Sequence, residues 1–325
     1  MKTLNKNSTR KLSTAILAVL VFAVGFGTAY LWSEQKFKKK LFAASETLAE
    51  GTNVRFPLLH PLAGKLQNLF IAVSPLRKEI EKTVKDYSQF HVGVYFESLR
   101  TGAWVGINEK EIFYPASLLK VPIAIAFLKS VEEKQYALDE EIEVKAKDLN
   151  QEYGAWYREK TVGQKASFRE VLTQMLKRSD NTARNMLIRY VSEAENRDVY
   201  EYLNLEVPEN QSSHLSLKKY GTIFRSLYWA DYLNEENSEF LLSLLVDSER
   251  PDLIPASLPP SAKVAHKFGV AQAQETLVDC GIVYLEPSRY LLCVSVKGQD
   301  AVDKGSEVIS AVSRTIYDYI SQNVE

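Results

Sequence analysis

The chain has few cysteines and histidines, no excess charge of either sign and no internal repeat. Its two cysteines cannot form a disulfide framework, and no spacing of Cys or His resembles a zinc site. With 40 basic and 41 acidic residues the formal net charge is −1, so no basic face for nucleic acid is predicted. Of the 325 residues, 46% are hydrophobic, which is typical of a globular protein. We therefore expect no metal, no cofactor and no nucleic-acid partner.

Cys280 and Cys293 lie in two β-like runs on either side of a turn at residues 286–289. This arrangement predicts that they are neighbours in a β-hairpin. Buried free thiols are the favoured interpretation, because an unpaired cysteine behaves as a small apolar residue.

The N-terminal region differs from the rest of the chain. Residues 1–40 hold eight basic side chains and one acid, Glu34. Within them, Leu12 to Trp32 form 21 residues without an ionisable side chain. Such a run is long enough to cross a hydrocarbon core about 30 Å thick as a helix. A cleaved secretory signal is the alternative, since the small residues at 27–29 offer a cleavage site.

We expect residues 1–40 to be a cytoplasmic basic tail with a single-pass transmembrane anchor, and residues 41–73 to be a stalk. Residues 74–325 then form an extracytoplasmic domain at the cell membrane, which would be secreted if the N-terminal segment were cleaved. The outside placement depends partly on the chemistry described below.

Strand-like runs at both ends of this domain enclose a mainly helical region. Strands are predicted at 92–96, 103–107, 263–270, 276–285 and 290–296, and helices at 76–87, 118–131, 167–178, 182–191, 217–233 and 306–320. The pattern predicts one sheet closed by segments far apart in sequence, with a helical subdomain at about 117–246 beside it.

Four Ser-x-x-Lys pairs occur, and only one has a context that suggests chemistry. A lysine three residues after a serine lies on the same helical face, where the amine can exchange a proton with the hydroxyl. Only Ser117 follows a strand and a turn and opens a long apolar helix, with Lys120 in its first turn. The other pairs are Ser8/Lys11, Ser33/Lys36 and Ser216/Lys219.

An apolar helix is buried, so Lys120 is expected to be removed from water. Desolvation lowers the pKa of an ammonium, which makes the amine a base near neutral pH. The helix N-terminus favours negative charge at Ser117, whose backbone N–H could point at an oxyanion. The alternative is that Ser117 is only a helix cap and that the Lys120 ammonium reaches solvent.

The motif Ser179-Asp180-Asn181 separates two helical patterns. Any of its residues makes a good helix cap, so a purely structural role is one interpretation. In the functional interpretation, Ser179 relays a proton and Asn181 holds a substrate amide.

The motif His266-Lys267-Phe268-Gly269 lies in a strand-like run. Lys267 could bind a substrate carboxylate, Gly269 would allow a ligand to approach the backbone, and the Val270 N–H could be a second oxyanion donor. A solvated edge-strand lysine is the alternative, and a Lys-x-Gly sequence recurs at Lys219-Tyr220-Gly221.

In this order the three motifs resemble those of the penicillin-recognising active-site-serine superfamily, and class A β-lactamases most closely. The resemblance extends over about residues 75–322. It implies an α/β domain with a mostly antiparallel sheet, packed against an all-α subdomain, and a site in the cleft between them. It also implies extracytoplasmic hydrolysis of a small partner, either a β-lactam or an amide like the D-alanyl-D-alanine end of a peptidoglycan peptide.

The resemblance also implies a role for each motif residue. Ser117 is the acylated nucleophile, Lys120 accepts its proton, and Ser179 passes a proton to the leaving nitrogen. The substrate-binding residues are Asn181, Lys267, Gly269 and Val270. The backbone amides of Ser117 and Val270 form the oxyanion hole.

Two departures from the family pattern limit the inferred activity. Phe268 replaces the usual hydroxyl residue after the strand lysine. The interval before residue 217 lacks the Glu-x-x-Leu-Asn stretch that supplies a water-activating glutamate, although Glu201, Glu206 and Glu209 lie there. The acyl-enzyme should therefore form and then hydrolyse slowly.

The same departures motivate the alternative of a catalytically weak or inactive wall-binding or sensory ectodomain. A Ser/His/Asp hydrolase is a more distant alternative, because the chain has no Gly-x-Ser-x-Gly elbow and no His in a triad context.

Overall fold

The computed structural model describes residues 73–207, 215–285 and 288–323. Their largest sheet has five antiparallel strands in the order β2-β1-β7-β6-β5. These strands are β1 (His91–Ser98), β2 (Trp104–Ile107), β5 (Lys263–Ala271), β6 (Thr276–Tyr284) and β7 (Tyr290–Lys297). The first two strands thus pair with the last three. This confirms the prediction that segments far apart in sequence share one sheet.

The predicted anchor at Leu12 to Trp32 and the predicted stalk lie outside the described residues, except for residue 73. Within the part of the chain that the structure describes, no helix is both long enough and apolar enough to span a bilayer.

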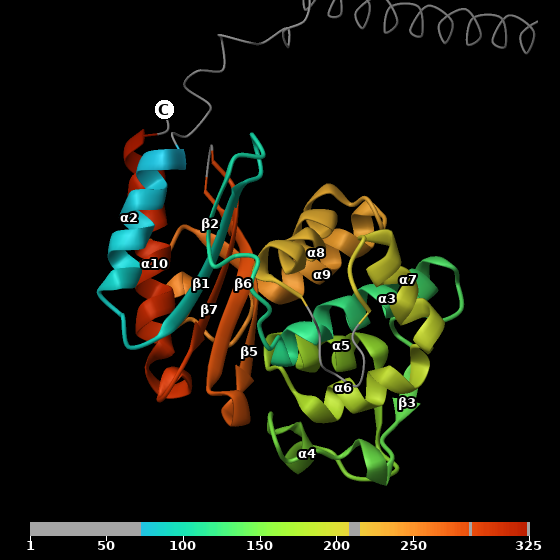
Figure 1. Cartoon of the computed structure of the whole chain (residues 1–325). Coiled ribbons are helices and arrows are strands. Elements are labelled where there is room, and N and C mark those ends of the chain that lie inside the picture. The colour runs from blue at the N-terminus through green and yellow to red at the C-terminus, as the bar shows by residue number, and fades with distance from the viewer. Residues whose placement is uncertain (1–72, 208–214, 286–287, 324–325) are drawn as a thin grey trace, which may run out of the picture. The chain divides into compact units, whose positions relative to one another are not determined.

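Two helices from opposite ends of the domain cover one face of the sheet. α2 (Val73–Lys85) and α10 (Ala301–Asn323) lie side by side against it (Figure 1). Strand side chains alternate between the two faces, so residues such as Phe96 and Leu292 reach this layer and pack with Val308 of α10. The final helix is longer than the predicted 306–320.

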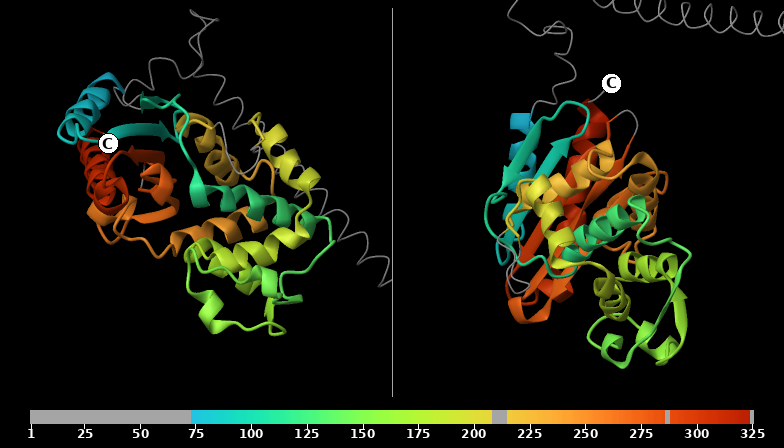
Figure 2. Two further views of the ribbon diagram at one scale, coloured as in Figure 1. Left: turned by 60° about the horizontal axis from the view of Figure 1, so that its bottom comes forward. Right: turned by 90° about the vertical axis from the view of Figure 1, so that its right-hand side faces the viewer.

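The helical subdomain covers the other face (Figures 1 and 2). Its helices are α3 (Lys120–Glu132), α5 (Phe168–Lys177), α6 (Asn181–Leu187), α7 (Glu193–Tyr202), α8 (Leu217–Trp229) and α9 (Glu235–Val246). α8 and α9 contact the sheet, while α3 is central and has ten buried residues out of 13. A small two-stranded sheet of β3 (Glu141–Glu143) and β4 (Lys165–Ser167), and the short α4 (Trp156–Glu159) between these strands, were not predicted.

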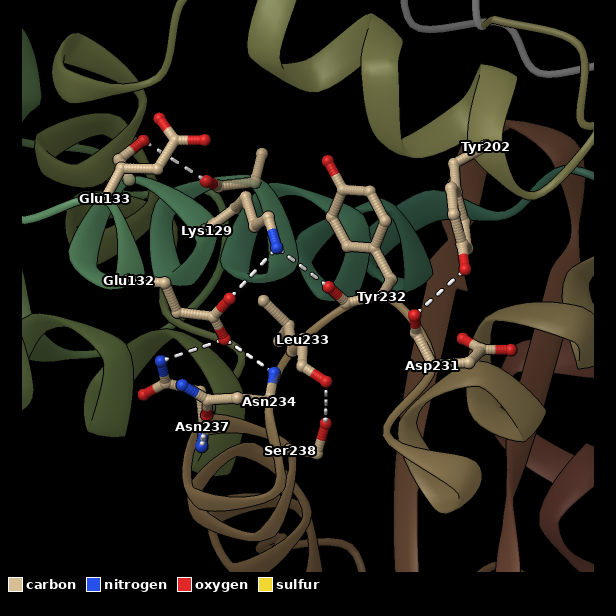
Figure 3. A network of polar contacts seen from close by, with 12 residues as sticks. Lys129, Glu132, Glu133, Tyr202, Asp231, Tyr232, Leu233, Asn234, Asn237 and Ser238 are labelled. Atoms are coloured by element: carbon tan, nitrogen blue, oxygen red, sulfur yellow. Dashed lines mark hydrogen bonds and ion pairs between the residues drawn. The ribbon is translucent and has the colours of Figure 1, made fainter.

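Polar contacts fix the C-terminal end of α3 to the loop before α9 (Figure 3). Glu132 accepts hydrogen bonds from the backbone N–H of Asn234 at 2.7 Å and from the side chain of Asn237 at 3.2 Å. Lys129 donates to the carbonyl of Tyr232 at 3.0 Å. The helix that carries the site lysine at its start is therefore also held at its other end.

Cys280 and Cys293 face each other across β6 and β7, which confirms that they are neighbours in a hairpin. The structure joins them in a disulfide, so the expectation of free thiols is wrong. Two cysteines at directly opposite positions on one face of antiparallel strands are close enough to bond.

Candidate active site

Ser117 lies in a 3-10 turn, η1 (Ala116–Leu119), that runs directly into α3. The single helix predicted over 118–131 is therefore two elements. Pro115 stands at the cap position of η1 and no side chain caps the turn, so Ser117 is not a helix cap. The preceding Ala116 has φ 46°, in the left-handed region that costs a non-glycine residue energy. The hydroxyl is thus held by a tight, strained turn.

Lys120 brings the serine and the Ser-Asp-Asn motif together. Its ammonium donates to Ser117 Oγ at 3.0 Å, to Ser179 Oγ at 3.2 Å and to Asn181 Oδ1 at 2.7 Å. It also donates to the carbonyl of Ser179. The side chain is only 3% exposed, so the alternative in which it reaches solvent is wrong.

Burial of Lys120 lowers its pKa to about 7. The charge of Asp180 opposes this shift, and the charge of Arg184 adds to it. A substantial fraction of the Lys120 amine is therefore neutral near pH 7. A neutral amine 3.0 Å from Ser117 Oγ can accept the proton of that hydroxyl.

Asp180 determines the shape of the Ser-Asp-Asn loop. Its Oδ1 accepts the N–H of Ala183 at 3.0 Å, which caps α6, and its Oδ2 accepts the N–H of Trp156 at 2.9 Å. Ser179 has φ 56° and no exposed surface. The capping interpretation of this motif is therefore correct for Asp180. The cap also holds Ser179 and Asn181, on either side of Asp180, in contact with Lys120.

A cavity of about 610 Å³ opens beside these groups. Ser117, Lys120 and Asn181 line it from the helical side, and Val270 lines it from β5. The two residues whose amides were predicted to form an oxyanion hole thus share one cavity.

The remaining predicted residues, Ser179, Lys267 and Gly269, are buried and are not among those that line the cavity. The Lys267 ammonium donates to the carbonyl of Phe268 at 3.2 Å and lies 4.0 Å from the centroid of its ring. Burial, and then the charge of Lys120, hold the pKa of Lys267 well below its usual value. The role of Lys267 as a carboxylate ligand stays a prediction.

Phe268 is a core residue and contributes no wall to the cavity. We expect Phe268→Thr to destabilise the protein by about 3 kcal/mol, because it leaves a void in the core. Phe268→Leu, which keeps most of the volume, should cost about 1 kcal/mol. Denaturant unfolding checks both variants, and equal stability of Phe268→Thr and the parent would contradict this packing.

Gly269 lets β5 pass close to the turn that holds Ser117. A Cβ at this position would lie 2.5 Å from the carbonyl oxygen of Pro115, so backbone must move. We expect Gly269→Ala to slow acylation of Ser117 by roughly 10- to 100-fold, since small displacements of reacting groups have effects of this size. Gly305→Ala in α10, where the atoms nearest to a Cβ would be side-chain atoms of Leu277 and Val296 at 3.3 Å, is the matched control. The acylation rate is the readout, and a normal rate in Gly269→Ala would show that this spacing is unimportant.

Of the three glutamates considered for water activation, the two that the structure describes do not line the cavity. Glu201 is exposed on α7, and Glu206 pairs with Lys219 at 2.9 Å on the surface. Glu209 lies outside the described residues. Among the cavity-lining residues that the structure describes, the one carboxylate belongs to Glu152.

Several cavity residues escaped the sequence analysis. Glu152 and Tyr153 come from the loop before α4, and Arg184 and Asn185 come from α6. A signal existed for Arg184, because a residue three positions after Asn181 lies on the same face of a helix. No local pattern marks the loop residues, since tertiary packing alone brings them to the cavity.

The fold and the site together define a serine hydrolase in which a buried lysine, not a histidine, contacts the hydroxyl of Ser117. The model of the β-lactamase enzyme family matches residues 75–320, and the chain belongs to that family. A β-lactamase of Bacteroides uniformis is 25% identical over 289 residues, which cover 77% of this chain and 98% of that protein.

Solved structures agree with this assignment. PBP-A is 27% identical with a TM-score of 0.70, covering 77% of this chain and 97% of its own. A β-lactamase from Chitinophaga pinensis is 25% identical with a TM-score of 0.68, covering 75% of this chain and 98% of its own. The predicted α/β and all-α architecture is confirmed.

Proposed function

We propose that β-lactams, or peptide amides that resemble D-alanyl-D-alanine, acylate Ser117, and that the resulting ester is hydrolysed slowly. The observation that supports this most is the 3.0 Å contact between Lys120 Nζ and Ser117 Oγ in a cavity wide enough for a small molecule. A variant of the similar protein PBP-A has been solved as an acyl-enzyme complex with penicillin G.

In the first half of the reaction, Ser117 Oγ attacks the substrate carbonyl and its proton moves to neutral Lys120. The C–N bond then breaks, and the leaving nitrogen takes a proton from Ser179, which Lys120 replaces. This step requires that substrate binding expose the Ser179 hydroxyl, which is covered in the structure. Ser179 Oγ lies 3.2 Å from the Lys120 amine, within reach of this relay. In the second half, water must attack the ester. Within the described part of residues 181–217, no carboxylate lines the cavity, and Glu152 reaches it from a different segment. This supports slow turnover.

Intact-mass measurement of the full chain after incubation with benzylpenicillin tests the proposal. We expect a mass increase equal to the whole penicillin, persisting for many minutes, and none in Ser117→Ala. Fast loss of penicillin without an adduct would indicate an efficient β-lactamase. Neither adduct nor turnover would favour the inactive-ectodomain alternative and overturn the proposal.

We further propose that Leu12 to Trp32 anchor the chain in the cell membrane with the catalytic domain outside. The length of the apolar run and the basic residues before it support this, as does a substrate class found outside the cytoplasm. Protease added to intact cells should degrade residues 41–325. Their protection would reverse the proposed orientation.

A further inference from the structure

A smaller cavity lies next to the cavity at Ser117. This side cavity, of about 180 Å³, shares the lining residues Leu119, Ile123 and Arg184 with the main cavity. Its other walls are apolar at Ile188, Val191 and Tyr200 and polar at Ser192, Glu193 and Asn196. Apolar side chains predominate, and Glu193 is its one carboxylate among the described residues.

Three residues on one face of α6 and its extension line the main cavity, the side cavity or both. Asn181, Arg184 and Ile188 are spaced by three and then four residues along α6 and its 3-10 extension η3 (Ile188–Tyr190). Residues at these spacings lie on one face. Leu119 and Ile123 form the wall shared with both cavities from η1 and α3. Arg184 therefore lies between Asn181 and Ile188 on this face and lines both cavities.

The hydrogen bonding of Asn181 indicates which part of a substrate would lie next to it. Its Oδ1 accepts from Lys120 at 2.7 Å, so the amide N–H₂ group is available to a substrate carbonyl in the main cavity. If Asn181 binds the amide on the acyl side of the scissile bond, the acyl substituent runs along α6 toward the side cavity.

Arg184 is a cation placed at the junction of the two cavities. The structure gives its guanidinium a single side-chain hydrogen bond, to Asn185 Oδ1 at 3.3 Å, and an electrostatic interaction with Glu152. A guanidinium has five N–H donors in a planar fork that matches a carboxylate. Lys267, the predicted carboxylate ligand, is covered, whereas Arg184 faces the cavity.

We propose that Arg184 and the side cavity select the acyl half of the substrate. The preferred acyl group carries a carboxylate next to the amide that Asn181 binds, and an aryl or branched alkyl group beyond it. An apolar cavity of about 150 Å³ holds a benzene-sized molecule, so the side cavity can accept a phenyl group. This inference rests on the proposed function, because the acyl group is placed by its ester bond to Ser117.

Three penicillins that share the nucleus and a phenyl group test the charge preference. Carbenicillin carries a carboxylate on the side-chain carbon next to the amide, benzylpenicillin carries no charge there, and ampicillin carries an ammonium. We expect the full chain to be acylated by carbenicillin about tenfold faster than by benzylpenicillin, and by ampicillin most slowly. In Arg184→Gln the carbenicillin to benzylpenicillin ratio should fall to about one, and in Arg197→Gln, an exposed arginine of α7, it should not change.

The ratio of two rates within one variant does not depend on how much of that variant is folded. Equal rates with the three penicillins, or an unchanged ratio in Arg184→Gln, would overturn the inference while leaving the proposed function intact. Failure of every penicillin to form an adduct would instead overturn the proposed function.

A second variant tests the side cavity itself. Ile188 is 39% exposed, so Ile188→Trp can fill the cavity without disrupting the core. We expect it to slow acylation by all three phenyl penicillins about tenfold, and to leave acylation by 6-aminopenicillanic acid, which has no acyl chain, unchanged. Val162→Trp, at an exposed loop position, is the matched control. Equal slowing of all four compounds, or slowing of none, would rule out a role for the side cavity in binding the acyl chain.

Discussion

Lys120→Arg is expected to slow acylation of Ser117 by roughly 10²- to 10⁴-fold, the usual contribution of a positioned general base. Arginine keeps the positive charge and can still donate to Ser179 and Asn181, but it does not lose its proton in the accessible pH range. The variant therefore separates the two functions that Lys120 could have. The rate of adduct formation with benzylpenicillin, measured by mass, is the readout.

The pH dependence of the same reaction gives an independent check. Lys120 acts as a base only when neutral, and burial lowers its pKa to about 7. The acylation rate of the parent protein should therefore rise as the pH increases through about 7 and then level off. The rise should be absent in Lys120→Arg. A nearly normal rate in that variant, or a flat profile in the parent, would show that the lysine contributes charge and not proton transfer.

The sequence was sufficient to predict the sheet, the central helix and the serine–lysine pair. Those features follow from local patterns: alternating apolar residues, a long apolar helix and a spacing of three residues. The burial of Lys120 also followed, since an apolar helix must be covered on all sides. To predict the pairing of β1 with β7, one further assumption was needed: that strands at both ends of the domain share a sheet.

Other parts of the site could not be predicted because they depend on contacts between distant segments. Lys267 is fully buried and lies close enough to Lys120, from a distant segment, for the charge of Lys120 to lower its pKa. The second hydrogen bond of Asp180 comes from Trp156, 24 residues earlier. Gly154 is also required by a distant contact, because a Cβ there would lie 2.0 Å from Asp180 Oδ2. Its φ of 90° is a second reason, since residues other than glycine rarely adopt it.

Loss of the Asp180 carboxylate should therefore lower the stability of the protein and increase the neutral fraction of Lys120. We expect Asp180→Asn to lower the free energy of unfolding by roughly 2–4 kcal/mol, because its carboxylate accepts two backbone N–H groups in a fully buried position. An asparagine oxygen can accept only one of them, and its N–H₂ group faces the other donor. Denaturant unfolding measures this loss, and Asp139→Asn, an exposed carboxyl that pairs with Arg169, should leave stability unchanged.

The catalytic effect of the same substitution concerns the base. The negative charge of Asp180 raises the pKa of Lys120, against the larger opposing effect of burial. Removing that charge should lower the pKa of Lys120 further, so the rise in acylation rate should move to a pH below about 7. A variant that is less stable but has more neutral amine at acidic pH would separate the electrostatic role of Asp180 from its role as a cap. A midpoint that stays in place or moves upward would show that Asp180 only holds the loop.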